Sequence, residues 1–349
     1  MNAVTRAFAA VACGAYAALA AAPAEDRVEA DRLRAHLEAL DEPRSGFGGA
    51  EELAALDEAM RYAEQAFREA GYKTEKHLFT HVPQAPWRRR MTERTEWHNL
   101  VAERRGAERP QEVLVLGAHI DTVPRSPGAD DNASGVAALL EIARVIAEGP
   151  APDITVRFVV FNLEEVGLIG ARAYASDARA VLARDIDDVG ERMIGMLSLE
   201  MLGYYSDEPG SQRSPITPIE GVFEPPDTGD FLALVTILPY QPFNKELASA
   251  MAEAAPGLPT LRVDFSATPA PDMMRSDHAP FWMIKVPAVM VTDTSNFRNP
   301  HYHTPGDTIE TLDLARYEQA VRALAGATAR MSGAIGELPD NEPAASQPE

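Results

Sequence analysis

Residues 117 to 145 read GAHIDTVPRSPGADDNASGVAALLEIARV and give the clearest indication of the fold. This stretch begins at the end of an apolar run, EVLVLGAHI from residue 112, and it finishes in a segment whose apolar residues recur at helical spacing. The loop between them carries four titratable side chains: His119, Asp121, Asp130 and Asp131. Crowding acidic groups beside a buried strand is unfavourable unless a positive charge lies among them. The stretch therefore predicts a strand, a cation-binding loop and a helix.

Two further apolar runs, ITVRFVVFNL from residue 154 and MIGMLSLEML from residue 193, lack clean alternation, as do strands that are buried on both faces. Strand, helix and strand in this order predict a parallel pairing covered by a helix. Further strands are expected at 231–238, 260–265 and 287–292, and helices at 26–43, 50–70, 244–255, 278–284 and 313–334. The predicted fold class is α/β, a three-layer αβα sandwich with a mostly parallel central sheet.

The composition limits the partners. The chain has 349 residues, 46% of them hydrophobic, and its 53 acidic and 32 basic residues give a net charge of -21. Such a charge repels nucleic acid and anionic membrane surfaces. We therefore expect no nucleic-acid partner, and ligands that are small, cationic or metallic.

The N-terminus predicts export. Residues 1–24 contain one basic residue, Arg6, then an apolar run to about Leu19, then small residues, which is the pattern of a secretory signal peptide. We expect a periplasmic or secreted protein with no stable membrane insertion once the signal is removed. Lipid anchoring through Cys13 is not expected, because only six apolar residues precede it from Ala7. The mature protein would contain no cysteine and no disulfide.

The remaining chain predicts one catalytic domain, residues 25–335. Within it, residues 206–230 are dense in Pro, Gly and Ser and have no period, which indicates a long flap loop. Residues 336–349 are predicted to be a disordered tail.

Three predicted strands deliver ligand-type side chains to one edge of the sheet. His119 and Asp121 follow the first strand, Glu164 and Glu165 follow the second, and Glu200 ends the third. Ligands gather at the carboxyl ends of strands in such sheets. Imidazoles and carboxylates without cysteine suit zinc, with cobalt or manganese as alternatives. A pair of ions would need a bridging carboxylate and a further imidazole, which the segment NPHYHTPGDT offers at His301 or His303.

These motifs resemble those of metallopeptidase family 28, the co-catalytic di-zinc exopeptidases. The resemblance covers about residues 95 to 325 and includes GAHID, GADDNASG, NLEEVGLIG, LSLEMLGYY and YHTPGDT in the family's order. It implies the zinc exopeptidase type of α/β fold, described as phosphorylase/hydrolase-like, and two bound Zn²⁺ ions.

The resemblance also implies a role for each residue. One ion would be held by His119, Glu165 and Asp130, and the other by Glu200, His303 and Asp130. Asp130 would be the bridging carboxylate, joined to Asp131 by a cis peptide bond. Asp121 would orient the His119 imidazole through its carboxylate, and Glu164 would be the general base.

Two positions depart from the leucine aminopeptidases of the family. Glu200 stands where they have Asp, and Met273 stands where they have a Tyr that stabilises the oxyanion. His278 is then the expected oxyanion donor, with a structural role held by Asp277 as the alternative. Substrate contacts are expected from Tyr204 and Phe297, and more weakly from Tyr205, Phe223 and Trp282.

The function expected from this reading is a two-zinc exopeptidase. It would most simply be an aminopeptidase that hydrolyses the terminal peptide bond of short peptides, with water activated by Glu164. The alternatives are a glutaminyl cyclase or other non-peptide amidohydrolase, a carboxypeptidase of the same family, and a binding protein without activity.

Overall fold

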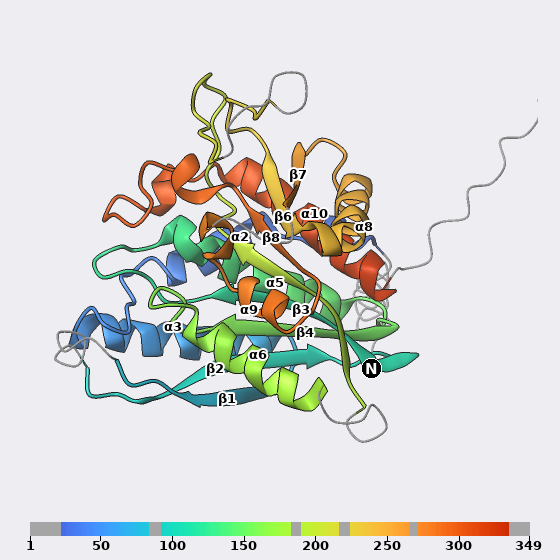
Figure 1. Cartoon of the computed structure of the whole chain (residues 1–349), viewed down its shortest axis with the longest axis horizontal. Helices are drawn as coiled ribbons and strands as arrows, with labels where there is room; N and C mark the ends of the chain where they lie inside the picture. Colours follow the sequence, from blue (N-terminus) through green and yellow to red (C-terminus); the bar gives the residue numbers. More distant parts are fainter. Residues whose placement is uncertain (1–21, 84–91, 183–189, 216–223, 266–270, 335–349) are drawn as a thin grey trace, which may run out of the picture.

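A computed structural model describes residues 22–83, 92–182, 190–215, 224–265 and 271–334. It confirms the predicted fold class, because one eight-stranded, mostly parallel sheet lies between helices on both faces (Figure 1). The strand order is β1-β2-β4-β3-β5-β8-β6-β7. The strands are β1 Thr74–Thr80, β2 Glu96–Arg104, β3 Arg109–His119, β4 Ile154–Phe161, β5 Arg192–Glu200, β6 Leu232–Ile237, β7 Thr260–Phe265 and β8 Ala288–Thr292.

The centre of the sheet, β4-β3-β5-β8, is parallel throughout. β1 and β2 extend it on one side by antiparallel pairing, and β6 joins β8 antiparallel on the other side, with β7 parallel to β6. The carboxyl ends of β3, β4, β5 and β8 therefore meet at one edge, which is where α/β proteins bind ligands.

Helices cover both faces of the sheet. One layer contains α2 Ala30–Ala39, α3 Ala50–Glu69, α5 Gly135–Glu148, α8 Gln241–Ala254 and α10 Leu314–Ser332, and the other contains α6 Ile169–Leu182 and α9 Ala279–Met283. Short helical turns lie at η1 Ala24–Arg27, η2 Ala129–Ser134, η3 Leu238–Tyr240, η4 Pro271–Met274, η5 Ser295–Phe297 and η6 Ile309–Thr311.

The continuous apolar run of β3 is explained by burial on both faces. Leu114 and Leu116 belong to the large core that contains α5, whereas Val113 and Val115 pack in the opposite core with residues of α6 and α9. All four side chains are fully buried. Successive side chains of a strand point to opposite faces, so a strand between two helical layers must be apolar at every position.

The sequence patterns predicted every central element but missed β1, β2 and α6. β1 is an edge strand whose side chains are mostly exposed, with Leu78 72% exposed. A strand of this kind carries polar residues that give no apolar signal. Among the described residues, no helix is both long and apolar enough to cross a membrane.

Glycine lets the first turn of α5 approach the sheet closely. A Cβ atom at Gly135 would lie 2.4 Å from the Leu199 carbonyl oxygen on β5 and 2.4 Å from Asn132 Oδ1. Only glycine avoids both contacts. This approach holds the acidic turn η2 over the ends of β3 and β5, where the expected site residues lie.

Candidate metal centre

The ends of two neighbouring parallel strands bring His119 and Glu200 together. His119 is the last residue of β3 and Glu200 the last residue of β5. The distance from His119 Nε2 to Glu200 Oε2 is 3.4 Å. Glu164 follows β4 by three residues, and its carboxylate lies within 4.8 Å of these ligand atoms. The predicted convergence at the sheet edge is therefore present in the fold.

A single carboxylate, that of Asp131, faces both expected imidazoles. Its Oδ1 lies 3.2 Å from His119 Nε2, and its Oδ2 lies 3.1 Å from His303 Nε2. Glu165 completes the second group, with Oε2 3.1 Å from His303 Nε2. This is the arrangement that a carboxylate bridging two metal ions requires.

The expectation that Asp130 is the bridging residue is wrong. Its carboxylate points away from both imidazoles and accepts hydrogen bonds from the Gly203 amide at 2.9 Å and from Asn299 Nδ2 at 2.7 Å. The cis peptide bond also lies one residue later than expected, between Asp131 and Asn132. Neighbouring residues in this irregular turn point in different directions, so two adjacent aspartates cannot be told apart by the motif alone.

The expected division of the ligands between the two ions is also corrected. The geometry pairs His119 with Glu200, and His303 with Glu165, the reverse of the expected carboxylate partners. The reason lies in the sheet order, because β5 is hydrogen-bonded directly to β3 and so places Glu200 beside His119. Glu165 follows β4, on the other side of β3.

Asp121 holds His119 by a different atom from the one expected. The backbone carbonyl of Asp121 lies 3.0 Å from His119 Nδ1, whereas its carboxylate oxygen Oδ1 is 3.9 Å away. The carboxylate instead accepts the backbone amides of Glu164 at 2.9 Å and Glu165 at 3.2 Å. One residue therefore directs His119 Nε2 toward the site and fixes the segment that carries both glutamates.

Asp307 fixes the turn that carries Asp131. Its two carboxylate oxygens accept the backbone amides of Asp130 at 2.9 Å and Asp131 at 3.0 Å. The pKa of Asp307 is raised to about 7, mainly by burial and in addition by the charge of the nearby Asp130. The motif HTPGDT thus supplies both a ligand-type imidazole, His303, and the support for the carboxylate opposite it.

Among the described residues, three of the eight non-glycine residues with positive φ lie at or next to ligand-type residues. Leu163, Met201 and His303 have φ angles of 59°, 54° and 59°. Residues other than glycine rarely adopt this left-handed conformation. Leu163 directly precedes Glu164, and Met201 directly follows Glu200. Such strain persists where the surrounding structure fixes a side chain for function.

The chemistry of these residues suits a bound metal ion. His119 Nε2 and Glu165 Oε1 are buried and have no hydrogen-bond partner, although ligand-type atoms surround them. Two groups of converging ligand atoms form: His119, Glu164 and Glu200 in one, and Asp131, Glu165 and His303 in the other. Burial lowers the pKa of His303, but Asp131 and Glu165 raise it overall to about 10. Carboxylates this close together repel one another, and a bound cation would offset this repulsion.

Glu164 has the properties of a general base. It is 7% exposed, and its carboxylate belongs to the group with His119 and Glu200 but does not face His303 as the Asp131 carboxylate does. Burial raises its pKa, and Glu200 and Glu165 add to this effect while His119 opposes it. Enzymes raise the pKa of a catalytic glutamate in this way to bring it near the working pH.

His278 does not fit the expected role of oxyanion donor. It is fully buried, its Nε2 lies 2.9 Å from the Met273 carbonyl oxygen, and its ring packs edge-on against Trp282 with centroids 4.4 Å apart. Burial lowers its pKa to about 4, so the ring is neutral at physiological pH. The alternative, a structural role for His278, agrees better with these contacts. Asp277 does not hold the ring, however, because both Asp277 carboxylate oxygens lack a hydrogen-bond partner.

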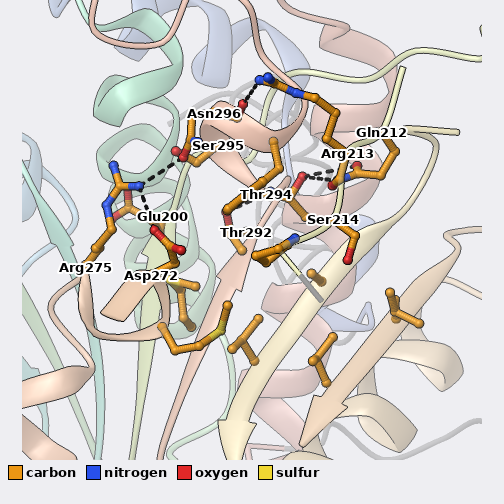
Figure 2. A pocket seen from close by; sticks show the side chains of 18 of the residues that line it. Glu200, Gln212, Arg213, Ser214, Asp272, Arg275, Thr292, Thr294, Ser295 and Asn296 are labelled. Carbon is orange, nitrogen blue, oxygen red and sulfur yellow. Dashed lines mark hydrogen bonds and ion pairs between the residues drawn. The ribbon is translucent and has the colours of Figure 1, made fainter. Parts of the chain in front are cut away.

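An apolar pocket opens beside the metal centre (Figure 2). Its space, including the solvent at its mouth, is about 850 Å³. Strands β6, β7 and β8 form its apolar wall through Ala233, Val235, Leu261, Val263, Phe265 and Met290. Glu200 lies at one side of it, which connects the pocket with the candidate metal centre.

The residues expected to contact the substrate lie in different parts of the structure. Phe297 lines the pocket, whereas Tyr204 is not among the lining residues, and its ring lies 6.3 Å from that of His301. Tyr205 and Trp282 are buried in the core. Phe223 lies outside the described residues.

Sequence reasoning missed Tyr302 and Arg275, which also line this pocket. The Tyr302 ring stacks on the His303 ring, with centroids 3.7 Å apart and planes 19° apart. Arg275 Nη2 donates a hydrogen bond to the Tyr302 hydroxyl at 2.6 Å. Tyr302 directly precedes His303 in the sequence, so its position beside a ligand-type residue was a signal that could have been used.

The fold and the site together define a hydrolase-type metal centre at the edge of a parallel sheet. The model of peptidase family M28 matches residues 99–223 and 235–328. The chain belongs to peptidase family M28 and is accordingly a zinc-dependent peptidase.

The chain is also similar to individual proteins. The chain is 34% identical over 235 residues to the protein YfbL of Escherichia coli, a match that covers 64% of this chain and 68% of YfbL. It is 28% identical over 222 residues to the aminopeptidase YwaD of Bacillus subtilis, covering 60% of this chain but 39% of YwaD. The latter match therefore spans well under half of that relative.

Solved structures share the fold. An aminopeptidase from Aneurinibacillus sp. strain AM-1 superposes with a TM-score of 0.62 at 19% identity, covering 88% of this chain and 94% of that one. A glutaminyl cyclase from Macrostomum lignano superposes with a TM-score of 0.64 at 18% identity, covering 88% and 91%. At these identities the likeness concerns the fold alone.

Proposed function

We propose that this protein is a two-zinc aminopeptidase that removes the first residue of short peptides. The observation that carries the proposal is the position of Asp131, whose two carboxylate oxygens face His119 and His303 separately. One zinc ion would be held by His119, Glu200 and Asp131, and the other by His303, Glu165 and Asp131. Cobalt or manganese would suit the same oxygen and nitrogen ligands.

The chain's own residues supply the proton transfers. Bound zinc provides Lewis-acid polarisation of a carbonyl group and lowers the pKa of water toward about 7. Glu164 takes the proton from the attacking water on its carboxylate and returns it to the leaving amine. Its raised pKa suits both halves of this task, because the carboxyl must both accept and release a proton near neutral pH.

Tyr302 is our candidate for the oxyanion donor in place of the expected His278. Arg275 donates to the phenolic oxygen, so the Tyr302 proton is free to point at a substrate carbonyl oxygen. Burial and the carboxylates of Asp131 and Glu165 raise its pKa, which keeps the hydroxyl protonated. Donors aimed at developing negative charge are a major source of rate enhancement.

The pocket next to Glu200 suits the side chain of the first residue. Its apolar wall would bind a large aliphatic or aromatic side chain. The same placement brings the positively charged α-amine of the peptide near the carboxylates of Glu200 and Glu164. YwaD, named an aminopeptidase, supports this choice over a carboxypeptidase.

We also propose export to the periplasm or the medium. The predicted signal peptide, residues 1–24, lies outside the described residues except for its last three. The single catalytic domain over residues 25–335 and the tail at 336–349 stay predictions, because the tail and residues 216–223 of the flap lie outside the described residues as well.

The test is zinc content of the mature protein by elemental analysis, together with release of nitroaniline from leucine nitroanilide before and after chelation. The expected result is about two zinc ions per chain and release that stops with the chelator and returns with zinc. One zinc ion and cyclisation of N-terminal glutamine would support a glutaminyl cyclase instead. Two zinc ions with cleavage only at the carboxyl end of a peptide would support a carboxypeptidase.

A further inference from the structure

A guanidinium group lies unexpectedly close to the acidic metal centre. Arg275 and Glu200 line the same pocket, in a chain whose net charge is -21 (Figure 2). Tyr302 contacts both Arg275 and His303, so a single aromatic ring separates the Arg275 guanidinium from the His303 imidazole. A cation placed here attracts an anion that the neighbouring carboxylates would otherwise repel.

The contacts of Arg275 fix its position without using all its donors. Nη2 donates to the Tyr302 hydroxyl at 2.6 Å, and Nη1 donates to Asn296 Oδ1 at 3.1 Å. Asp272, the charged partner, is 3.5 Å away and itself 44% exposed. A guanidinium has five N–H donors, and the Arg275 side chain is 42% exposed. Donors therefore remain for a ligand at the mouth of the pocket.

A second guanidinium adds to the positive charge at this mouth. Arg213 lines the pocket as well, and its Nη2 bonds the backbone carbonyl of Asn296. Asn296 therefore holds Arg275 by its side chain and Arg213 by its backbone (Figure 2). The Arg213 amide also donates to the Phe297 carbonyl at 2.8 Å, which ties this part of the chain to the pocket rim.

We infer that the preferred substrates are dipeptides and that Arg275 binds their free carboxylate. This inference rests on the proposed function. The α-amine would face Glu200, the first side chain would enter the apolar pocket, and the carboxylate of the second residue would meet Arg275. Each additional residue would move that carboxylate about 3.3 to 3.6 Å further along an extended chain, beyond the reach of a side chain held by Tyr302 and Asn296.

The experiment compares kcat/KM for leucyl-glycine with that for leucyl-glycine amide, which lacks only the negative charge. For the zinc-loaded wild-type protein, kcat/KM is expected to be higher for the acid by about tenfold or more. The reason is that a hydrogen bond between a guanidinium and a carboxylate is stronger than one to a neutral amide. Arg275→Met should reduce this ratio to near one. Arg275→Lys, which keeps the charge, should give an intermediate ratio. Arg109→Met, at the start of β3 and not among the residues that line the pocket, is the control and should leave the ratio unchanged.

The ratio separates carboxylate binding from a purely structural role. If Arg275 only positions Tyr302, its replacement slows both substrates equally and the ratio persists, which overturns the inference. Equal rates on acid and amide in the wild type overturn it too, but leave the aminopeptidase intact. Failure to cleave either substrate by a protein that still releases nitroaniline from leucine nitroanilide would overturn the inference alone. Failure on leucine nitroanilide as well, by a protein that holds two zinc ions, would refute the proposed function itself.

Discussion

The metal centre and the apolar pocket share the Glu200 side chain but are built in different ways. His119 and Glu200 of the candidate metal centre end β3 and β5, and Glu164 and Glu165 closely follow β4, whereas Asp131 and His303 lie in loops further along the chain. The pocket is formed by the antiparallel and parallel pairings of β6, β7 and β8 together with loop residues from 212 to 302. Most ligand-type residues are therefore set by short segments at strand ends, whereas the pocket wall is assembled from segments that are distant in the chain.

The largest expected effect concerns the metal centre. Glu164→Gln removes the proposed base but no proposed zinc ligand, so turnover of leucine nitroanilide should fall by about 10² to 10⁴-fold. Zinc content measured on the same preparation should stay at the wild-type value. Normal turnover by this variant would eliminate Glu164 as the base.

A matched pair of substitutions tests the corrected bridge. Asp131→Asn removes the charge that faces both imidazoles, and zinc affinity measured by competition with a chelator should fall by at least about 100-fold. Asp130→Asn should retain zinc, because burial and the neighbouring Asp293 already raise the Asp130 pKa and favour its neutral form. The opposite result would restore Asp130 as the bridging residue.

Zinc affinity should depend on pH. In the metal-free protein the pKa of His303 is raised to about 10, so the imidazole must lose a proton before it binds zinc. Affinity should therefore weaken by about tenfold for each unit that the pH falls below this value, for this one proton. In the metal-free protein, the stability that His303 contributes has the opposite pH dependence. It is present at low pH and is lost as the pH rises through about 10.

Calorimetry in buffers of different ionisation enthalpy would measure the protons released on zinc binding. A release of no protons at pH 7 would contradict this account of His303.

A smaller effect is expected from the pocket. Ala233 on β6 is 2% exposed and lines the wall. Ala233→Val narrows the space, so kcat/KM for leucine nitroanilide should fall by about tenfold. Alanine nitroanilide, with its small side chain, should be affected by less than about threefold. An equal loss on both substrates would mean that the change disturbs the metal centre and not the pocket.

The smallest effect is expected outside both regions. The Asp313 side chain accepts the Arg316 amide at 3.0 Å and caps the N-terminus of α10. Asp313→Ala should reduce the free energy of unfolding by about 1 kcal/mol, measured by denaturant titration. Zinc content and the preference among substrates should not change, which makes this variant a control for the two regions.

Sequence patterns predicted the fold class because the central strands are buried on both faces and the helices carry an apolar stripe. They failed for β1, β2 and α6, and in β1 the mostly exposed side chains explain the missing apolar signal. They placed His119, Glu164, Glu165 and Glu200 at one edge, because parallel strands necessarily end there. They reached His303 by the need for a further imidazole and by the family resemblance. They could not decide between Asp130 and Asp131, which are adjacent in the sequence and differ only in direction.

By itself, the sequence determined that this protein is an α/β protein with acidic and imidazole side chains gathered at the carboxyl edge of its sheet. The tertiary structure decided which carboxylate faces both imidazoles, which glutamate stands beside which histidine, and that Tyr302 and Arg275 adjoin the site while His278 does not. The physical reason is that a motif fixes the residue type and its strand end, whereas the direction of a side chain depends on the turn that carries it. Its partners depend on strand order and on loops that are distant in the chain.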